Sequence, residues 1–159
     1  MTEIDGDASV IEPERFTVRR AIRIDAPRGS VWRAVTEAEH VARWFGRPAL
    51  EGAGVGATGV IDFGSDDIVP LRIEALDEPR SITYRWNSDD ALGSHPAEID
   101  ERTSTVFTFT LDEVEGGTLL TVVESGFERT SDPAANMESH RWGWDEKTDV
   151  LVTLLESAQ

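Results

Sequence analysis

The feature that most constrains the fold of this chain is a change of hydrophobic period in its last quarter. Residues 117–126 alternate between two faces, which is typical of a half-buried strand. From Asp132 onward the period becomes about 3.6 residues, and one face of the resulting helix carries a largely apolar stripe. The residues of this stripe are Met137, Trp144, Thr148, Leu151 and Leu155. Because an amphipathic helix is not stable alone, it must pack this stripe on a sheet built by earlier strands.

The earlier part of the chain supplies the strands of that sheet. The first strand spans residues 16–24, in which Arg20 is the polar exception on an apolar face. Alternating patterns and turn residues predict five more strands, at 58–64, 68–77, 80–87, 103–113 and 117–126. No helical period long enough for a crossover separates these five strands, so we expect an antiparallel sheet.

Helices and loops complete the expected architecture. Two short helices are predicted over residues 28–36 and 37–45. Residues 46–59, which contain several glycines and a proline, are predicted as a loop, and residues 88–102 form one long internal loop. Residues 1–14 are acidic and lack periodicity, which predicts a mobile tail before a single domain over residues 15–159. The fold class is therefore α+β: a helix-grip fold with a curved six-stranded antiparallel sheet wrapped around a long C-terminal helix.

Composition excludes several classes of partner. The chain has 159 residues, 39% of them hydrophobic, which is enough for one domain with a buried core. It contains no cysteine, so neither disulfides nor thiolate chemistry can operate. A formal net charge of −16 opposes binding to nucleic acids and to anionic membrane surfaces. No apolar run is long enough to span a bilayer and no signal pattern is present, so we expect a cytoplasmic protein.

Three patterns that could hold a cofactor, a metal or a nucleophile lack the context that such sites need. Residues 54–59 match G-x-G-x-x-G, but a loop precedes them and a strand follows, so no helix N-terminus is available for a phosphate. His40, His95 and His140 are widely separated, which does not favour a zinc site. No G-x-S-x-G elbow occurs. We therefore expect neither a metal nor a cofactor.

Four segments resemble, in order, the motifs of one superfamily. Residues 18–46 contain a strand, an Ala-Pro break and two helices, the second ending in Trp-Phe, and residues 77–86 contain a Pro-centred turn and a strand ending in Trp. Residues 117–127 resemble the last strand of the family, and residues 143–144 its helix motif. Over about residues 16–156 the chain thus resembles the START-like helix-grip superfamily (polyketide cyclase and birch-pollen-allergen-like proteins). It is most similar to homologues of the C-terminal domain of the heat-shock-protein-90 ATPase activator.

The resemblance implies a hydrophobic pocket between the sheet and the C-terminal helix. The side chains expected to bind a ligand there are Trp44, Phe45, Phe63, Tyr84, Trp86, Phe107, Phe109, Glu124, Met137, His140, Trp144, Thr148 and Leu151. Trp44 and Phe45 are expected near the mouth, with the 88–102 loop as a flap. Aromatic walls with a few polar groups are typical of small-molecule sites, although the same aromatics also suit plain core packing.

Glu124 is the most informative polar candidate, because the resemblance turns its carboxylate into the pocket. An unpaired carboxylate there would be costly, so either its pKa rises or it finds a partner. The candidate partners are His140, Arg141 and Arg20. In a binding protein Glu124 would orient the polar end of a ligand, and in an enzyme it would serve as a general base. The alternative is a buried ion pair without a ligand role.

Three functions therefore stay open. The first is a binding protein for a hydrophobic or aromatic small molecule, and the second is a polyketide cyclase-like enzyme that uses a pocket carboxylate. The third, a stress-response module that contacts a chaperone, is less favoured because we find no counterpart of the activator's N-terminal domain. Trp142 lies off the apolar stripe and indicates a contact surface, such as that of a homodimer. The fold alone does not decide, because it hosts carriers, cyclases and chaperone regulators.

Overall fold

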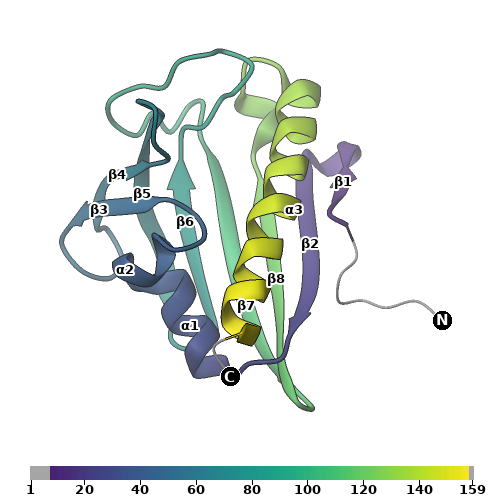
Figure 1. The fold of residues 1–159 in the computed structure, drawn as a ribbon. Coiled ribbons are helices and arrows are strands. Elements are labelled where there is room, and N and C mark those ends of the chain that lie inside the picture. Colours follow the sequence, from purple (N-terminus) through teal and green to yellow (C-terminus); the bar gives the residue numbers. More distant parts are fainter. Residues whose placement is uncertain (1–7, 158–159) are drawn as a thin grey trace.

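An antiparallel sheet of eight strands forms the body of the protein in the computed structural model, which describes residues 8–157 (Figure 1). The strands are β1 (Val10–Glu12), β2 (Thr17–Ile24), β3 (Arg47–Glu51), β4 (Thr58–Asp62), β5 (Ile68–Asp77), β6 (Ser81–Trp86), β7 (Thr105–Val114) and β8 (Gly117–Ser125). Their order across the sheet is β1-β2-β8-β7-β6-β5-β4-β3, and every neighbouring pair is antiparallel. The antiparallel arrangement predicted from the turns is therefore confirmed.

Helices cover one face of this sheet. They are α1 (Arg28–Thr36), α2 (Ala38–Val41) and α3 (Pro133–Ser157), with single 3₁₀ turns at Pro13–Arg15 and Phe127–Arg129. The long helix α3 runs in front of β2, β8 and β7, while α1 and α2 lie near its C-terminal end and beside β3 (Figure 1). The α+β helix-grip class and its long C-terminal helix are thus confirmed.

The sheet has eight strands rather than the six predicted, because its two edge strands show no recognisable pattern. β1 lies in the segment predicted as a mobile tail, residues 1–14, of which residues 1–7 fall outside the described part of the chain. Its three residues are too few to show a period, and pairing with β2 holds them in place. β3 lies in the Gly- and Pro-containing segment 46–59 predicted as a loop, and it tolerates Pro48 because it is an edge strand.

The second predicted helix is also shorter than residues 37–45. Regular helix ends at Val41, and turns continue to residue 45. The amides of Trp44 and Phe45 both donate to the carbonyl of Val41 in these turns. Val41, Trp44 and Phe45 are consequently all buried, as their helical spacing indicates.

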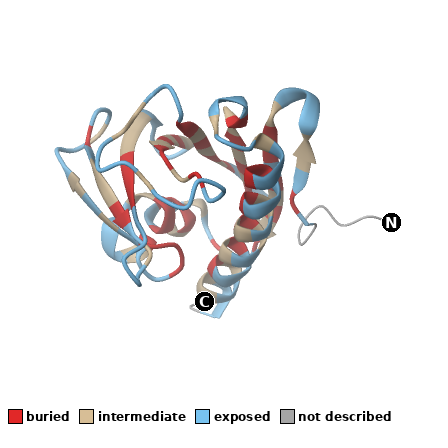
Figure 2. Cartoon of the chain, turned by 90° about the horizontal axis from the view of Figure 1, so that it is seen from above, coloured by how far each residue is buried: buried red, intermediate tan, exposed pale blue. Residues whose placement is uncertain are grey.

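The core lies between the helices and the concave face of the sheet (Figure 2). Alternate residues of β6 and β7 are buried, namely Ile82, Tyr84, Trp86, Phe107, Phe109 and Leu111. The stripe on α3 is buried at Met137, Trp144, Thr148 and Leu151 and half-buried at Leu155. Trp142, on the outer face of α3, is 62% exposed, in agreement with its position off the stripe. No helix within residues 8–157 is both long and apolar enough to cross a membrane.

Candidate functional site

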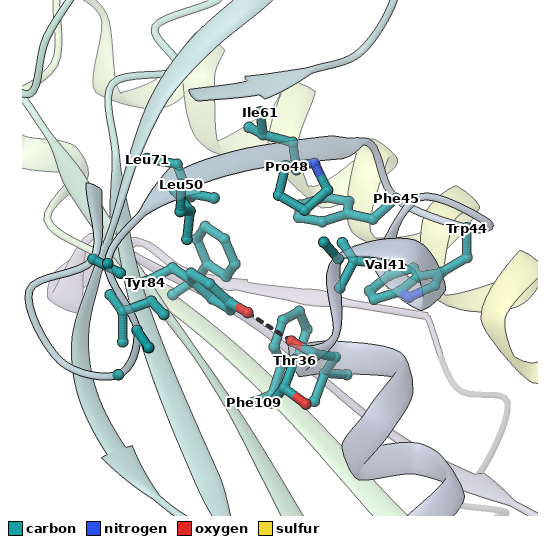
Figure 3. Close-up of a pocket in the computed structure, with 18 residues that line it drawn as sticks. Thr36, Val41, Trp44, Phe45, Pro48, Leu50, Ile61, Leu71, Tyr84 and Phe109 are labelled. Atoms are coloured by element: carbon teal, nitrogen blue, oxygen red, sulfur yellow. Dashed lines mark hydrogen bonds between the residues drawn. The ribbon is translucent and has the colours of Figure 1, made fainter. Parts of the chain in front are cut away.

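A cavity of about 310 Å³ opens between α1, α2 and the β3–β4 end of the sheet (Figure 3). We call it the apolar cavity. The residues around it that Figure 3 labels are Thr36, Val41, Trp44, Phe45, Pro48, Leu50, Ile61, Leu71, Tyr84 and Phe109. No side chain of α3 lines it. This cavity therefore lies beside α1 and α2, and the expected position between the sheet and the C-terminal helix is wrong for it.

The side chains around the apolar cavity are uncharged and mostly apolar. None of the residues within 8–157 that line it carries a charge. The hydroxyl of Tyr84 donates to the carbonyl of Val35 at 2.7 Å, and the hydroxyl of Thr36 donates to the carbonyl of Trp32 at 2.7 Å. Burial raises the pKa of Tyr84, so this phenol stays neutral. Both hydroxyl oxygens can still accept a hydrogen bond, which suits a ligand with few polar groups.

The turns after α2 build one wall of the apolar cavity. The indole N–H of Trp44 donates to the carbonyl of Ala34 at 2.8 Å, which fixes its ring, and Phe45 stacks on it with ring centroids 5.0 Å apart. The next residue must be small. A Cβ at Gly46 would lie 2.9 Å from side-chain atoms of Ile61 and Phe63, closer than van der Waals contact allows.

A second, smaller cavity of about 150 Å³ lies beneath the middle of α3. We call it the second cavity. Its lining residues are Phe45, Phe63, Asp67, Trp86, Ser88, Asp90, Ser139, His140, Gly143, Trp144 and Lys147. It differs from the apolar cavity in having charged residues among its lining, and Phe45 lines both cavities. This is the space that lies under the C-terminal helix.

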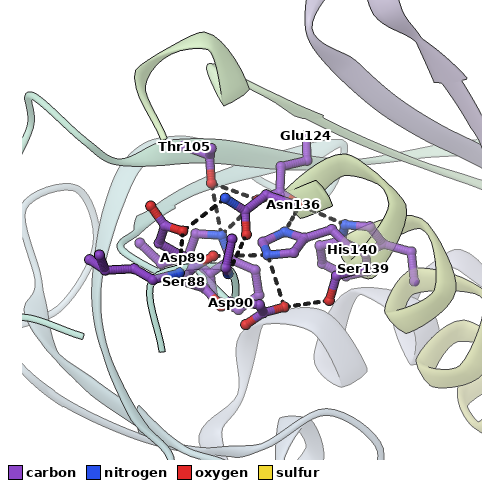
Figure 4. A network of polar contacts seen from close by, with 12 residues as sticks. Ser88, Asp89, Asp90, Thr105, Glu124, Asn136, Ser139 and His140 are labelled. Carbon is purple, nitrogen blue, oxygen red and sulfur yellow. Dashed lines mark hydrogen bonds and ion pairs between the residues drawn. The ribbon is translucent and has the colours of Figure 1, made fainter. Parts of the chain in front are cut away.

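The carboxylate of Glu124 is bonded to residues that line the second cavity (Figure 4). Glu124 is fully buried, and each of its oxygens accepts two hydrogen bonds. Oε2 accepts from the Trp86 indole at 2.8 Å and from the Thr105 hydroxyl at 2.6 Å, and Oε1 accepts from the Trp144 indole at 2.9 Å and contacts Nδ1 of His140 at 2.8 Å. Burial alone would raise the pKa of Glu124, but the charge of His140 and these hydrogen bonds together lower it.

His140 forms the cationic half of a buried ion pair. Its Nδ1 faces Glu124, and its Nε2 lies 2.9 Å from the Ser88 carbonyl and 3.5 Å from a carboxylate oxygen of Asp90. Burial disfavours the charged ring, but Glu124 and Asp90 outweigh it and raise the pKa of His140. An ionised carboxylate and a carbonyl only accept hydrogen bonds, so a doubly protonated imidazolium satisfies both contacts. The side chain of His140 is therefore a charged imidazolium, and that of Glu124 is a charged carboxylate.

The first turns of α3 also form hydrogen bonds with the start of the 88–102 loop (Figure 4). The side chain of Asn136 donates to Asp89 at 2.8 Å, and the hydroxyl of Ser139 donates to Asp90 at 2.6 Å. The loop that was expected as a flap is thus bonded to the helix at its first residues. Its role as a flap stays a prediction.

The buried ion pair predicts a stability plateau with a decline on each side. A raised pKa of His140 gives stability that is complete below its ordinary pKa of 6.5 and is lost as pH rises through the folded value. A lowered pKa of Glu124 gives stability that is present above its ordinary pKa of 4.5 and is lost as pH falls through the folded value. Urea denaturation from about pH 2 to 9 should show both declines, and His140→Gln should abolish the alkaline one. An alkaline decline unchanged in that variant would contradict the assignment.

The structure distributes the predicted ligand-binding residues over three places. Those that line the apolar cavity are Trp44, Phe45, Tyr84, Phe107 and Phe109. Those that line the second cavity are Phe45, Phe63, Trp86, His140 and Trp144. Those that line neither of these two cavities, and are buried in the core, are Glu124, Met137, Thr148 and Leu151. Sequence reasoning missed Leu50 and Asp90 because both lie in segments predicted as loops, where no period indicates which way a side chain points.

Of the three candidate partners of Glu124, only His140 pairs with it. Arg20, on β2, is buried against a more C-terminal part of α3. There it bonds to the Thr148 hydroxyl at 2.6 Å and pairs with Asp149 at 2.9 Å. Arg141 points outward and pairs with Glu138. Neither Arg141 nor Arg20 is therefore the partner. α3 turns Arg141 outward, and on β2 it is Val18 that pairs in register with Glu124, whereas Arg20 pairs with Val122.

The remaining motifs have plain structural roles. Residues 54–59 lead directly into β4, so no helix follows the glycines. His40 lies near Glu37 at 3.5 Å, and His95 contacts Asp67 at 3.1 Å. No group of three or more His, Cys, Asp or Glu side chains within residues 8–157 could hold a metal ion.

Comparison with known proteins adds a family and several structures. A family model described as activator of Hsp90 ATPase homolog 1-like protein matches residues 25–156. No curated protein matches the chain significantly. The solved structure of DynU16, from the dynemicin biosynthetic locus, is 27% identical, with a TM-score of 0.71 over 90% of this chain and 48% of that chain. This chain therefore spans about half the length of DynU16.

Two further structures match nearly over their full length. The protein MLL2253 from Mesorhizobium loti is 24% identical, with a TM-score of 0.71 over 90% of this chain and 98% of that one. The Aha1 dimer from Colwellia psychrerythraea is 19% identical, with a TM-score of 0.69 over 88% of this chain and 96% of that one. At these identities the likeness concerns the fold. Together with the family match, it confirms the resemblance to the START-like helix-grip superfamily.

Proposed function

Because the chain belongs to the family of activator of Hsp90 ATPase homolog 1-like proteins, we propose that it is a small-molecule-binding protein whose ligand has a hydrophobic or aromatic body. The observation that carries this proposal is the apolar cavity of about 310 Å³, which no charged residue lines. Protein interiors are close-packed, so a space of this size is more than a packing defect. It lies at the lower end of the range of about 300–1,000 Å³ that is typical of ligand pockets.

The enzyme alternative has less support. A cyclase that uses a pocket carboxylate needs a carboxylate that reaches the ligand, whereas Glu124 lines neither cavity and its two oxygens already accept four hydrogen bonds. A base whose pKa is lowered and whose lone pairs are occupied is poorly suited to proton abstraction. DynU16 comes from the dynemicin biosynthetic locus, and this is compatible by analogy with a small-molecule ligand.

A contact with a second copy of the chain is a separate proposal. It is supported by the exposure of Trp142 and, by analogy, by the Colwellia protein, whose solved structure is that of a dimer. Contact with a chaperone has only the family name in its favour.

The binding proposal is tested by closing the mouth of the apolar cavity. Ala38 lines this cavity and is exposed, so Ala38→Trp should obstruct it without loss of stability. We expect the uncharged fluorophore N-phenyl-1-naphthylamine to bind the unaltered protein saturably at one site, and to bind Ala38→Trp about tenfold more weakly. Ala49→Trp makes the same change on the outer side of β3 and should bind normally. Fluorescence titration measures all three proteins, and unsaturable uptake, or equal affinity in Ala38→Trp, would refute the proposal.

A further inference from the structure

The second cavity combines aromatic walls with an acidic rim. Four of its lining residues are aromatic, namely Phe45, Phe63, Trp86 and Trp144. Asp67 and Asp90 line the same cavity, and their side chains are 52% and 45% exposed. We propose that this cavity is a second subsite, which takes the ammonium head of an amphipathic amine whose apolar body fills the apolar cavity. This inference rests on the proposed function and adds the chemical class of the ligand.

Aromatic faces next to carboxylates are the surroundings that organic cations prefer. The protein already places one ammonium group there: Nζ of Lys147 lies 5.6 Å from the ring centroid of Phe63. No carboxylate within residues 8–157 lies within ion-pair distance of Lys147, so its position reflects the aromatic face rather than an acidic neighbour. A ligand ammonium can occupy the same surroundings.

The charges around the second cavity favour a cation over an anion. The charged residues that line it are Asp67, Asp90, His140 and Lys147. The charge of His140 is balanced by Glu124, which lies 2.8 Å away and does not line the cavity. Asp67 also contacts His95 at 3.1 Å, and Asp90 lies 3.5 Å from Nε2 of His140. Because Glu124 already balances His140, the carboxylates of Asp67 and Asp90 still outnumber the one ammonium group, that of Lys147. The whole chain carries a formal net charge of −16, which also attracts cations from solution and repels anions.

The ring of Phe45 is the partition between the two cavities. Phe45 is the one residue that lines both, and it stacks between Trp44 and Trp144, at 5.0 and 5.4 Å between ring centroids. A third, surface hollow that includes Ala42 and Gly46 borders Phe45 as well. In this proposal the ligand displaces the Phe45 ring toward that hollow, which would join the two cavities into one passage, apolar at one end and acidic at the other.

Four probes separate the subsite from the apolar cavity. Naphthalene fits the apolar cavity alone, while decylamine, decanol and decanoate share one chain and differ in their heads. By isothermal titration calorimetry we expect decylamine to bind about tenfold more tightly than decanol, and decanoate to bind most weakly. In the double variant Asp67→Asn/Asp90→Asn, decylamine should fall to the affinity of decanol while naphthalene binding is unchanged. The control Asp112→Asn/Glu115→Gln removes the same two charges at exposed positions elsewhere and should keep the preference.

Competition tests whether one ligand spans both cavities. We expect decylamine to displace naphthalene, because its body enters the apolar cavity, whereas tetramethylammonium, which fits the second cavity alone, should not. If naphthalene binds but decylamine shows no advantage over decanol, the subsite is refuted and the proposed function stands. An amine preference that persists without Asp67 and Asp90, or decylamine that leaves naphthalene in place, also overturns the inference. Failure of every probe to bind would refute the proposed function itself.

Discussion

Replacing Glu124 by glutamine is expected to lower the free energy of unfolding by about 3–5 kcal/mol, which is the usual cost of breaking a buried charge pair from one side. Glutamine has the same shape as glutamate, so the substitution creates no void. Its amide oxygen can still accept from His140 and Trp144, and its amide nitrogen can donate to the Thr105 hydroxyl. The Trp86 indole N–H loses Oε2 as an acceptor but keeps the Thr105 hydroxyl, at 3.0 Å. What disappears is the negative charge beside the imidazolium ring of His140, which is 2.8 Å away and buried. The expected loss therefore measures charge rather than packing.

A double-mutant cycle isolates this pair. If the loss arises from the unpaired imidazolium, then His140→Phe in the Glu124→Gln background should cost less than in the unaltered protein, with a coupling energy of about 0.5–3 kcal/mol. Glu128→Gln is a matched control at an exposed position, and we expect it to change stability by less than about 0.5 kcal/mol. Urea denaturation of the four proteins of the cycle and of the control gives these energies. A Glu124→Gln protein as stable as the control would contradict a buried charge pair.

The same variant decides between the two roles predicted for Glu124. Weaker binding of N-phenyl-1-naphthylamine with unchanged stability would support a role in orienting the ligand. Lost stability with intact binding would show that the carboxylate supports the fold. The four hydrogen bonds to Glu124 and its absence from the lining of both cavities favour the second outcome.

The fold could be predicted wherever a hydrophobic period continues over many residues. α3 has 25 residues and β5 has 10, and both begin within a residue of the expected position. β1 and β3 have only three and five residues at the edges of the sheet, and their pairing partners rather than their own sequence determine them. Three residues are too few to show a period in β1, and Pro48 with the neighbouring glycines gives β3 the pattern of a loop, so tertiary pairing decides.

The candidate site was less predictable, because a cavity is a property of volumes and not of periods. The inward face of Glu124 followed from strand parity and resemblance, and the helical period brought His140 within reach as one of three candidates. The position of the apolar cavity depends on how far α2 and the strands β3 and β4 fall short of filling the space above the sheet. No pattern in the sequence reports that distance. The contacts of Asp89 and Asp90 with α3 were missed for a related reason, since irregular loops carry no directional signal.

Trp144→Ala is the second substitution with a large expected effect on stability. Trp144 is 3% exposed, and its ring lies within 6.1 Å, between centroids, of Phe45, Trp86 and Phe107. Truncation should cost about 3–5 kcal/mol through the lost burial and the void that remains. It also removes the indole N–H that donates to Glu124 at 2.9 Å, so one hydrogen bond to a buried charge is lost as well.

Trp142→Ala is the matched control, because it makes the same change two residues away on the same helix. Trp142 is 62% exposed, so this substitution should change the free energy of unfolding by less than about 0.5 kcal/mol. Chemical denaturation of both variants at several protein concentrations measures the difference. Equal losses that grow with concentration would mean that Trp142 is buried between two copies of the chain. A small loss for Trp144→Ala would contradict the placement of this ring in the core. The expected large loss, independent of protein concentration, would show that Trp144 is a main contact between α3 and the sheet.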